Sequence, residues 1–507
     1  MYAKYGIIDI GSNTMRLVIY KRDTNGRLKE IENVKMVVRL REDLTLEGNL
    51  SESGITKLIN ILLSFQEVTR HHKIKEVKCV ATATIRQANN QEEILEEVSN
   101  KTDFSMRILS EYEEAYYGNL AIILSFSIDE AITIDIGGGS TEITYFKNRE
   151  MQDYHSFPFG VLSLKKQFIS GDIPTVKEKE QISAFIKRNF ESLNWLHNKG
   201  VPVIAIGGSA RNMAQIHQGI CKYPLKDIHQ YQMNLADIHE LNHYLSNLSY
   251  MQLLKVDGLS NDRADIIIPG IEVFESLVVI TEAPVFLVSK KGLRDGIFCK
   301  DLMRLSGGKT FQNVIEQSLF ELAQDFKVNQ NFAGQLSKIS ASIFIDLKNS
   351  GLVDFSEEDL FYLMKGASIY NFGEIISFEA RSEHTFFLLT NRMIDGMNHK
   401  ERIKLALIAS YKNKDLFVQL VDPFQKWFSK AEQKKMRILG SILKLAWSLN
   451  STKRNIVEEI AMTAEPDQIH LEVTCEKGWK LEEYQANQQK KFLEKLLKRR
   501  IFISFHS

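Results

Sequence analysis

Ile8-Asp9-Ile10-Gly11-Ser12-Asn13-Thr14, followed by Arg16-Leu17-Val18-Ile19-Tyr20, reads as a strand, a tight polar turn and a second strand. The same pattern returns at Ile134-Asp135-Ile136-Gly137-Gly138-Gly139-Ser140, followed by Glu142-Ile143-Thr144-Tyr145-Phe146. A solenoid would need a shorter period and at least three copies. The two copies therefore predict two similarly folded halves that face each other.

The chain changes character along its length. Through about the first 300 residues, short β-branched strands alternate with helical stretches, a pattern typical of α/β proteins. After a segment at 306–310 that reads as a linker, apolar residues recur at helical spacing from 311 to 450. The last part combines a strand pattern at 469–474, a charged helix pattern at 480–500 and a strand pattern at 501–505. We therefore expect two related α/β domains, a helical domain and a small α+β domain, at 1–125, 126–305, 311–450 and 451–507.

The composition limits what the chain can bind. Of its 507 residues, 64 are Lys or Arg and 64 are Asp or Glu, so the formal net charge is zero. A generally basic nucleic-acid binder is not expected, and a polyanion site must be a local concentration of positive charge. The four cysteines form no CxxC pair, and acidic residues interrupt the longest apolar runs. We expect a cytoplasmic protein with reduced thiols and without a signal peptide, a membrane span or a disulfide framework.

The two repeated turns have the residues of a phosphate site. In each copy an Asp ends a strand and is followed by glycine and small hydroxyl residues. Such a turn places a carboxylate beside backbone N–H groups that converge on an anion, an arrangement that suits a phosphate together with a hard cation. An ordinary hairpin turn is the alternative for either copy alone, and the repetition of the Asp favours the phosphate interpretation.

A third glycine turn joins a buried strand to a helix. Val203-Ile204-Ala205-Ile206 leads into Gly207-Gly208-Ser209, and the helix is expected from Ala210 to Ile216. The free N–H groups and the positive end of the helix dipole would point toward an anion. Steric need alone also explains glycine in such turns, so the motif leaves both interpretations open.

Five motifs in order carry a resemblance to a known family. They are Asp9-Ile10-Gly11-Ser12-Asn13-Thr14, Ala81-Thr82-Ala83-Thr84-Ile85-Arg86-Gln87-Ala88, Glu113-Glu114-Ala115, Asp135-Ile136-Gly137-Gly138-Gly139-Ser140-Thr141-Glu142 and Arg263-Ala264-Asp265. Gly292-Leu293-Arg294-Asp295-Gly296 also fits. Together the motifs resemble the exopolyphosphatase and guanosine-pentaphosphate phosphohydrolase (Ppx/GppA) family, within the superfamily of actin, sugar kinases and heat-shock ATPases.

The resemblance implies a fold and a set of functional residues. The fold would be two actin-like (ribonuclease H-like) domains flanking a cleft, then a helical HD-like domain and the small α+β domain. Glu114 would be the catalytic base that activates water, and Arg86 would grip phosphate oxygens. Asp9, Asp135 and Glu142 would hold Mg²⁺ or Mn²⁺. The phosphate-binding residues would be Ser12, Asn13, Thr14, Gly137, Gly138, Gly139, Ser140, Thr141, Gly207, Gly208, Ser209 and Arg263.

The helical part departs from the HD-type pattern of longer family members. The segments that would carry the metal-binding His-Asp pair and a later histidine read Ser368-Ile369-Tyr370-Asn371 and Ala409-Ser410-Tyr411-Lys412. Because one remaining imidazole, at His384, does not make a metal site, we expect an architectural role for this domain. It would extend the polyanion groove, form a homodimer interface, or do both.

Four functions remain open at this stage. The first is an exopolyphosphatase that releases orthophosphate from linear inorganic polyphosphate, and the second is a hydrolase of guanosine pentaphosphate; the sequence does not separate these two substrates. The third is a phosphotransferase of the sugar-kinase kind, which would need an adenosine pocket. The fourth is a non-catalytic sensor of polyphosphate or a guanosine polyphosphate, which Glu114, Asp135 and Glu142 argue against.

Overall fold

The computed structural model describes residues 4–22, 28–305, 313–476 and 478–507. The chain divides into two compact units, Met1–Gln312 and Asn313–Ser507. The predicted linker at 306–310 lies outside the described residues.

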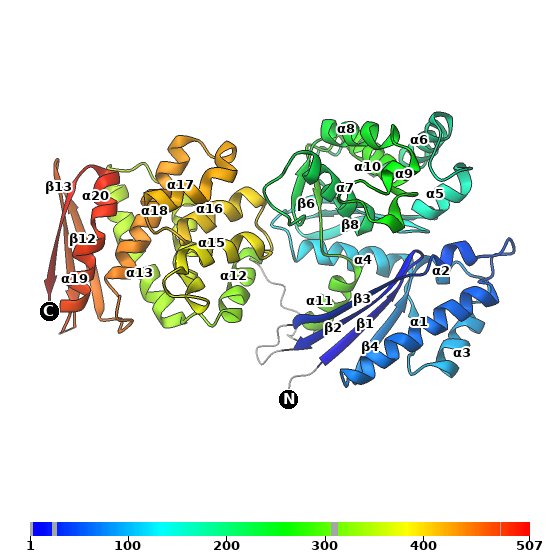
Figure 1. Ribbon diagram of the computed structural model, residues 1–507, viewed down its shortest axis with the longest axis horizontal. Helices are drawn as coiled ribbons and strands as arrows, with labels where there is room; N and C mark the ends of the chain where they lie inside the picture. The colour runs from blue at the N-terminus through cyan, green and yellow to red at the C-terminus, as the bar shows by residue number, and fades with distance from the viewer. Residues whose placement is uncertain (1–3, 23–27, 306–312, 477) are drawn as a thin grey trace. The chain divides into compact units, whose positions relative to one another are not determined.

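The first unit contains two sheets that share one order of five strands, and the second sheet adds β10 at its edge (Figure 1). The first sheet has the order β3-β2-β1-β4-β5, in which β1 is antiparallel to β2 and parallel to β4. The second has the order β10-β11-β9-β6-β7-β8, in which β6 is antiparallel to β7 and parallel to β9. The predicted duplication is therefore confirmed as two matching sheets. Their strands are β1 (Lys4–Ile10), β2 (Thr14–Arg22), β3 (Leu28–Val37), β4 (Glu76–Ala81), β5 (Met106–Ile108), β6 (Glu130–Ile136), β7 (Thr141–Lys147), β8 (Glu150–Phe157), β9 (Val203–Ile206), β10 (Tyr231–Met233) and β11 (Phe286–Val288).

Helices cover both sheets because the central strands are buried on both faces. The second sheet packs into the larger apolar core, which includes Phe190 and Phe274, both fully buried. The predicted helix after Gly207-Gly208-Ser209 is present and begins at Gly207. The helices of this unit are α1 (Glu52–His71), α2 (Ala83–Arg86), α3 (Gln91–Lys101), α4 (Glu111–Ile123), α5 (Val161–Phe168), α6 (Val176–Glu191), α7 (Gly207–Ile220), α8 (Leu235–Ser246), α9 (Tyr250–Leu253), α10 (Ile267–Thr281) and α11 (Leu293–Leu305).

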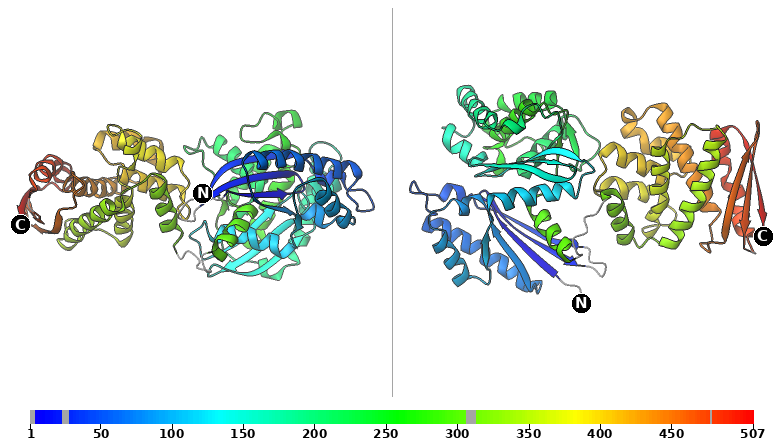
Figure 2. Two further views of the ribbon diagram at one scale, coloured as in Figure 1. Left: turned by 90° about the horizontal axis from the view of Figure 1, so that it is seen from below. Right: turned by 180° about the vertical axis from the view of Figure 1, so that it is seen from behind.

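Two helices cross between the halves and lie against each other. Helix α4 contacts β6, β7 and β8 of the second sheet, although it precedes them in the chain. Helix α11 comes at the end of the unit, yet Ile297 shares an apolar cluster with Ile7 and Val80 of the first sheet. Figures 1 and 2 show α4 running between the two sheets. Because each half supplies a helix that packs against the sheet of the other half, the two halves are held together near the site residues.

The second unit is helical and ends in a small sheet, as the apolar spacing predicted. Its sheet has the order β12-β13-β14, with β14 parallel to β13. The strand β12 was not expected from the sequence. The elements are α12 (Val314–Asp325), α13 (Gln330–Asn349), α14 (Glu357–Ser368), α15 (Arg381–Asn391), α16 (His399–Ala409), α17 (Lys414–Val421), α18 (Lys430–Ser448), β12 (Val457–Ala464), β13 (Gln468–Cys475), α19 (Lys480–Gln489), α20 (Lys491–Leu497) and β14 (Arg500–His506).

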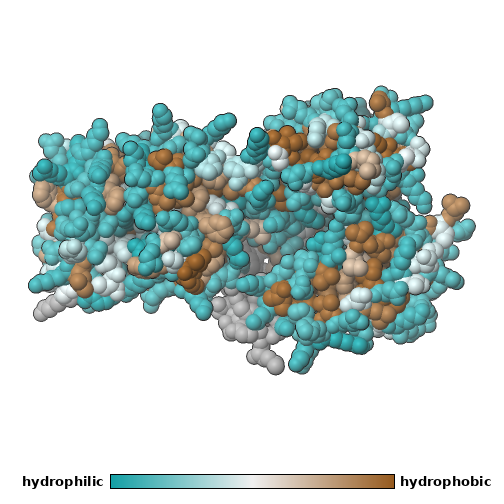
Figure 3. Space-filling model, in the orientation of Figure 1, coloured by the Kyte–Doolittle hydropathy of each residue, from teal (hydrophilic) through white to brown (hydrophobic). Residues whose placement is uncertain are grey.

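Most of the face shown in Figure 3 is hydrophilic. On this face, apolar side chains form separate groups on both units. Among the helices that the structure describes, none combines the length and the apolar character needed to cross a bilayer.

Candidate active site

The two repeated turns meet across the first unit. A Cβ atom added at Gly138 would lie 2.9 Å from Cβ of Ser12, and one added at Gly139 would lie 3.0 Å from its Oγ. Only glycine allows such a close approach of the two backbones. The duplicated turns thus form one site, in which each half supplies one wall.

A cavity of about 350 Å³ opens between these turns. Most of the residues expected at the site line it, and they come from both halves and from the third glycine turn. They are Asp9, Ser12, Asn13, Thr14, Glu114, Asp135, Gly137, Gly138, Ser140, Glu142, Gly207, Gly208 and Arg263. The structure therefore brings together residues from distant parts of the chain, from Asp9 to Arg263.

Four expected site residues are not part of the lining. The Thr141 hydroxyl donates to the carbonyl of Phe159 at 2.7 Å, so its proton is already used. The hydroxyl of Ser209 accepts a hydrogen bond from Nη1 of Arg263 at 3.3 Å. Gly139 faces Ser12, and Arg86 lies behind Glu114. These residues shape the cavity or support its lining.

Glu114 is held in place by the start of its helix and by Arg86. The hydroxyl of Ser110 caps α4 in a capping box with Glu113, which fixes the first turn that carries Glu114. Nη1 of Arg86 donates to Oε2 of Glu114 at 2.7 Å and to the carbonyl of Leu109 at 3.0 Å. Both side chains of the ion pair are 14% exposed. Arg86 is thus bound to the expected base, and its contact with phosphate stays a prediction.

Carboxyl groups crowd this end of the cavity. Asp135 and Glu142 are directly paired across β6 and β7, and Nη2 of Arg86 lies 4.0 Å from Oε1 of Glu142. Burial and the Glu114 charge raise the pKa of Glu142 well above its usual value. Burial also raises the pKa of Glu114, against the opposing effect of Arg86, and it raises that of Asp135 to about 6. Among the described residues, Arg86 is the one guanidinium within ion-pair distance of Glu114 and Glu142, and burial with mutual repulsion favours the protonated form of these two carboxyls.

These carboxyls fit a divalent cation that is shared with a phosphate. The raised pKa values of Asp135 and Glu142 mark a place where added positive charge would relieve repulsion. Among the described residues, no three His, Cys, Asp or Glu side chains converge closely enough to hold a metal alone. Asp9 is engaged by Nη1 of Arg294 at 2.9 Å. Mg²⁺ is commonly held in this way, by one or two carboxylates with waters and phosphate oxygens.

The structure adds cations that were not expected from the sequence. Arg211 lies one turn into α7, and burial together with three neighbouring arginines lowers its pKa to about 10. Arg294 comes from the Gly292–Gly296 motif, to which we assigned no role. A signal existed in both cases, since each arginine follows a glycine turn closely. The added cations in the lining are Arg16, Lys35, Arg211, Lys290 and Arg294.

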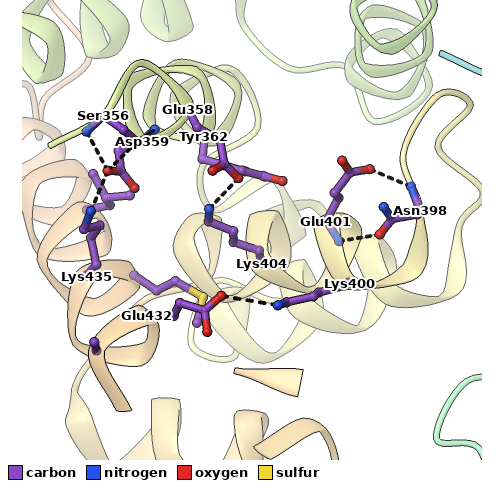
Figure 4. A pocket seen from close by; sticks show the side chains of 13 residues that line it. Ser356, Glu358, Asp359, Tyr362, Asn398, Lys400, Glu401, Lys404, Glu432 and Lys435 are labelled. Carbon is purple, nitrogen blue, oxygen red and sulfur yellow. Dashed lines mark hydrogen bonds and ion pairs between the residues drawn. The ribbon is translucent and has the colours of Figure 1, made fainter. Parts of the chain in front are cut away.

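A larger cavity of about 520 Å³ lies in the second unit, among α14, α16 and α18 (Figure 4). Each of its lysines forms an ion pair with a carboxylate. The pairs are Lys404 with Glu358 at 2.8 Å, Lys435 with Asp359 at 3.0 Å and Lys400 with Glu432 at 3.3 Å. Its cations are thus neutralised within the protein. The cavity of the first unit differs, because its arginines adjoin one another.

Comparisons with known proteins show the family of the chain. Residues 18–305 match the Ppx/GppA phosphatase family, and residues 314–498 match its domain III. An exopolyphosphatase 1 of Mycobacterium tuberculosis is 23% identical over 304 residues, which cover 59% of this chain and 88% of that protein. A guanosine-5'-triphosphate,3'-diphosphate pyrophosphatase of Aeromonas hydrophila is 22% identical over 492 residues, 95% of this chain and 94% of that protein.

The crystal structure of the Aquifex aeolicus member of the Ppx/GppA family is similar in fold and sequence. It superposes with a TM-score of 0.53 at 26% identity, covering 60% of this chain and 99% of that one. Since the family match extends over more than half of the residues and includes the second repeated turn and the third glycine turn, this chain belongs to the Ppx/GppA phosphatase family.

Proposed function

We propose that this chain is an exopolyphosphatase, which hydrolyses the terminal phosphoanhydride bond of linear inorganic polyphosphate and releases orthophosphate. The observation that supports this proposal most is the place of Glu114. It is a largely buried carboxyl on the wall of a cavity whose other walls are two glycine turns and a group of arginines. Such a site combines a base, amide donors and positive charge around one anion.

The reaction follows from these groups. Glu114, as a carboxylate, takes a proton from a water molecule whose oxygen forms the new bond to the terminal phosphorus. The bond from that phosphorus to the bridging oxygen breaks, and the shortened chain keeps the electron pair on that oxygen. Backbone N–H groups of the turns at 11–14 and 137–140 stabilise the charge on the transferred phosphoryl group. Arg86 acts as a positioning residue, because it fixes the Glu114 carboxylate at 2.7 Å.

Asp135 and Glu142, with Asp9 beside them, would hold the divalent cation. When it is bound, the cation neutralises charge on the phosphate oxygens. The residues that line the cavity would orient the terminal phosphate toward Glu114 and would keep the reacting end of the chain away from bulk water. We propose Mg²⁺ or Mn²⁺, because the donors are all oxygen atoms.

The lining favours an inorganic chain over a nucleotide. Among the described residues that line the cavity, none is aromatic, so the cavity offers no ring on which a guanine base could stack. Guanosine pentaphosphate is the second candidate substrate, because the relative named as its pyrophosphatase matches nearly the whole chain. A homodimer and an HD-like descent of the helical part stay predictions; mass in solution tests the first.

The test is phosphate release from long-chain polyphosphate and from guanosine pentaphosphate, with and without Mg²⁺. Glu114→Gln is expected to lower kcat on the order of a hundredfold or more, the usual contribution of a general base. Glu111→Gln is the matched control, since Glu111 is exposed on the same helical turn. Full turnover by Glu114→Gln would refute the assignment of the base. A higher kcat/KM on guanosine pentaphosphate would make the second candidate the substrate.

A further inference from the structure

A second cavity lies beside the cleft and also joins the two halves of the first unit. Its volume is about 370 Å³. The second half contributes Ser163, Lys166 and Gln167 of α5, and the first half contributes Arg41, Leu44, Thr45, Gly48 and Gln87. The lining thus holds two cations, several neutral polar side chains and no carboxylate among the described residues.

Arg41 is the unusual member of this cavity. Its Nη1 donates to Oε1 of Gln87, a neutral acceptor, and among the described residues no carboxylate lies within ion-pair distance of it. The two acids that follow it in the chain are engaged elsewhere. Glu42 pairs with Arg39 at 3.1 Å, and Asp43 pairs with Lys57 at 2.7 Å.

This arrangement is costly without an anion. Arg41 is partly buried, and burial is the only effect that shifts its pKa, which it lowers. A guanidinium that is partly withdrawn from water is stabilised by a partner of opposite charge, which offsets the desolvation. Lys166 adds a second positive charge, and it too has no carboxylate partner among the described residues. In the cavity of the second unit, by contrast, every lysine faces a carboxylate (Figure 4).

The cavity adjoins the turns of the candidate active site. The backbone N–H of Arg41 donates to the carbonyl of Ser12 at 3.2 Å. A Cβ atom at Gly139 would lie 3.5 Å from both Cδ and Nη1 of Arg41. On its other side, Gln87 follows Arg86 directly in the chain. The repeated turns therefore form a thin wall between this cavity and the cleft.

We propose that Arg41 and Lys166 form a second phosphate-binding site, in which one oxyanion bridges the two halves of the first unit. The guanidinium fork suits the paired oxygens of a phosphate group, and Lys166 supplies the opposing charge from α5. That the anion is a phosphate rests on the proposed function, whereas the presence of an anion site does not. Two sources offer the same chemistry: the released orthophosphate, and a phosphate group farther along the substrate chain.

Titration of the full chain with inorganic phosphate tests the site without any turnover. Isothermal titration calorimetry of the wild type is expected to detect two phosphate-binding sites, one in the cleft and one at Arg41. Arg41→Gln should abolish the second site or weaken it by roughly tenfold or more, the usual effect of losing a charged hydrogen-bond donor. Lys166→Gln should weaken it as well, and because Lys166 is exposed this variant is expected to fold. Arg188→Gln, an exposed arginine on α6, is the matched control and should keep both sites.

Kinetics then distinguish the two sources. If the site holds released orthophosphate, Arg41→Gln weakens product inhibition and leaves KM for long chains unchanged. If it holds the substrate chain, the variant raises KM for long chains roughly tenfold and leaves KM for tripolyphosphate nearly unchanged. Two phosphate sites of unchanged affinity in both variants would overturn the proposal. If the wild type releases no phosphate from any substrate, the proposed function fails, and the titration still decides the site.

Discussion

Asp135→Asn should stabilise the protein at neutral pH but not at acidic pH. Asp135 is the next-to-last residue of β6 and lines the cleft, directly opposite Glu142 on β7. Burial and the nearby charge of Asp9 raise its pKa from 3.8 to about 6, against the attraction of Arg211 and Arg294. An asparagine has nearly the shape of the protonated side chain and no charge to bury.

The size and the sign follow from this shift. A carboxyl with a raised pKa binds more protons in the folded state than in the unfolded state between pH 3.8 and about 6. The folded protein therefore loses stability as the pH rises through this window and loses no more above it. A shift of about two units corresponds to at most about 3 kcal/mol. The variant avoids this loss, so its advantage should grow by up to about 3 kcal/mol from about pH 3, below both pKa values, to about pH 8.

Scanning calorimetry at several pH values measures this advantage without bound cation or phosphate. At about 2 °C per kcal/mol, the melting transition that responds to the variant should lie about 5 °C above that of the wild type at pH 8. The two proteins should melt together only near about pH 3, below the unfolded pKa of the Asp135 carboxyl. Asp172→Asn is the control, because Asp172 is exposed in the same unit and its variant should follow the wild type at every pH. Parallel profiles for wild type and Asp135→Asn would refute the reasoning.

Two further predictions concern the support of the cleft. Arg86 lowers the pKa of Glu114, so Arg86→Gln should raise that pKa and move the acidic limb of the profile of kcat/KM against pH by about one unit to higher pH. Arg86→Lys, which keeps the charge, should move it less, and an unmoved limb in Arg86→Gln would exclude the coupling. A Cβ atom at Gly160 would collide with the carbonyl of Gly137, so Gly160→Ala should destabilise the protein by about 2 kcal/mol or more in chemical denaturation. Gly171→Ala, in an open loop, should leave the midpoint nearly unchanged.

The duplicated sheets could be predicted from the sequence because their signal is local. Each copy needs only an apolar strand, an Asp and a glycine turn in succession, and these lie within a few residues of Asp9 and Asp135. The sequence also predicted that the two turns meet. Each half carries an acidic residue beside a glycine turn, and two such matching turns suggest a shared ligand. The structure brings both carboxyls to one cavity.

The remaining features depend on contacts between distant segments. The sequence of helix α11 shows that it has an apolar face. Nothing in its own residues indicates that this face packs on the first sheet rather than on the second. The hydrogen bond from the Thr141 hydroxyl to the carbonyl of Phe159 could not be predicted either. The sequence does not show whether a hydroxyl beside a glycine turn already has a partner within the protein. Arg41 is the clearest case. Two acids follow it in the chain, and only the structure shows that both have other partners.

The charges of the cleft fall into two groups, and under the proposed function this division would orient a polyanion. Besides burial, the cations Arg16, Arg263 and Arg294 lower the pKa of Arg211, which lines the same cavity. The pKa of Glu114 responds instead to Arg86, Asp135 and Asp9. A polyanion would gain most from lying beside the group of arginines. Its terminal phosphate would approach Glu114 once a divalent cation screens the carboxyls, so this division of charge supports the proposal that the chain is cleaved at its end.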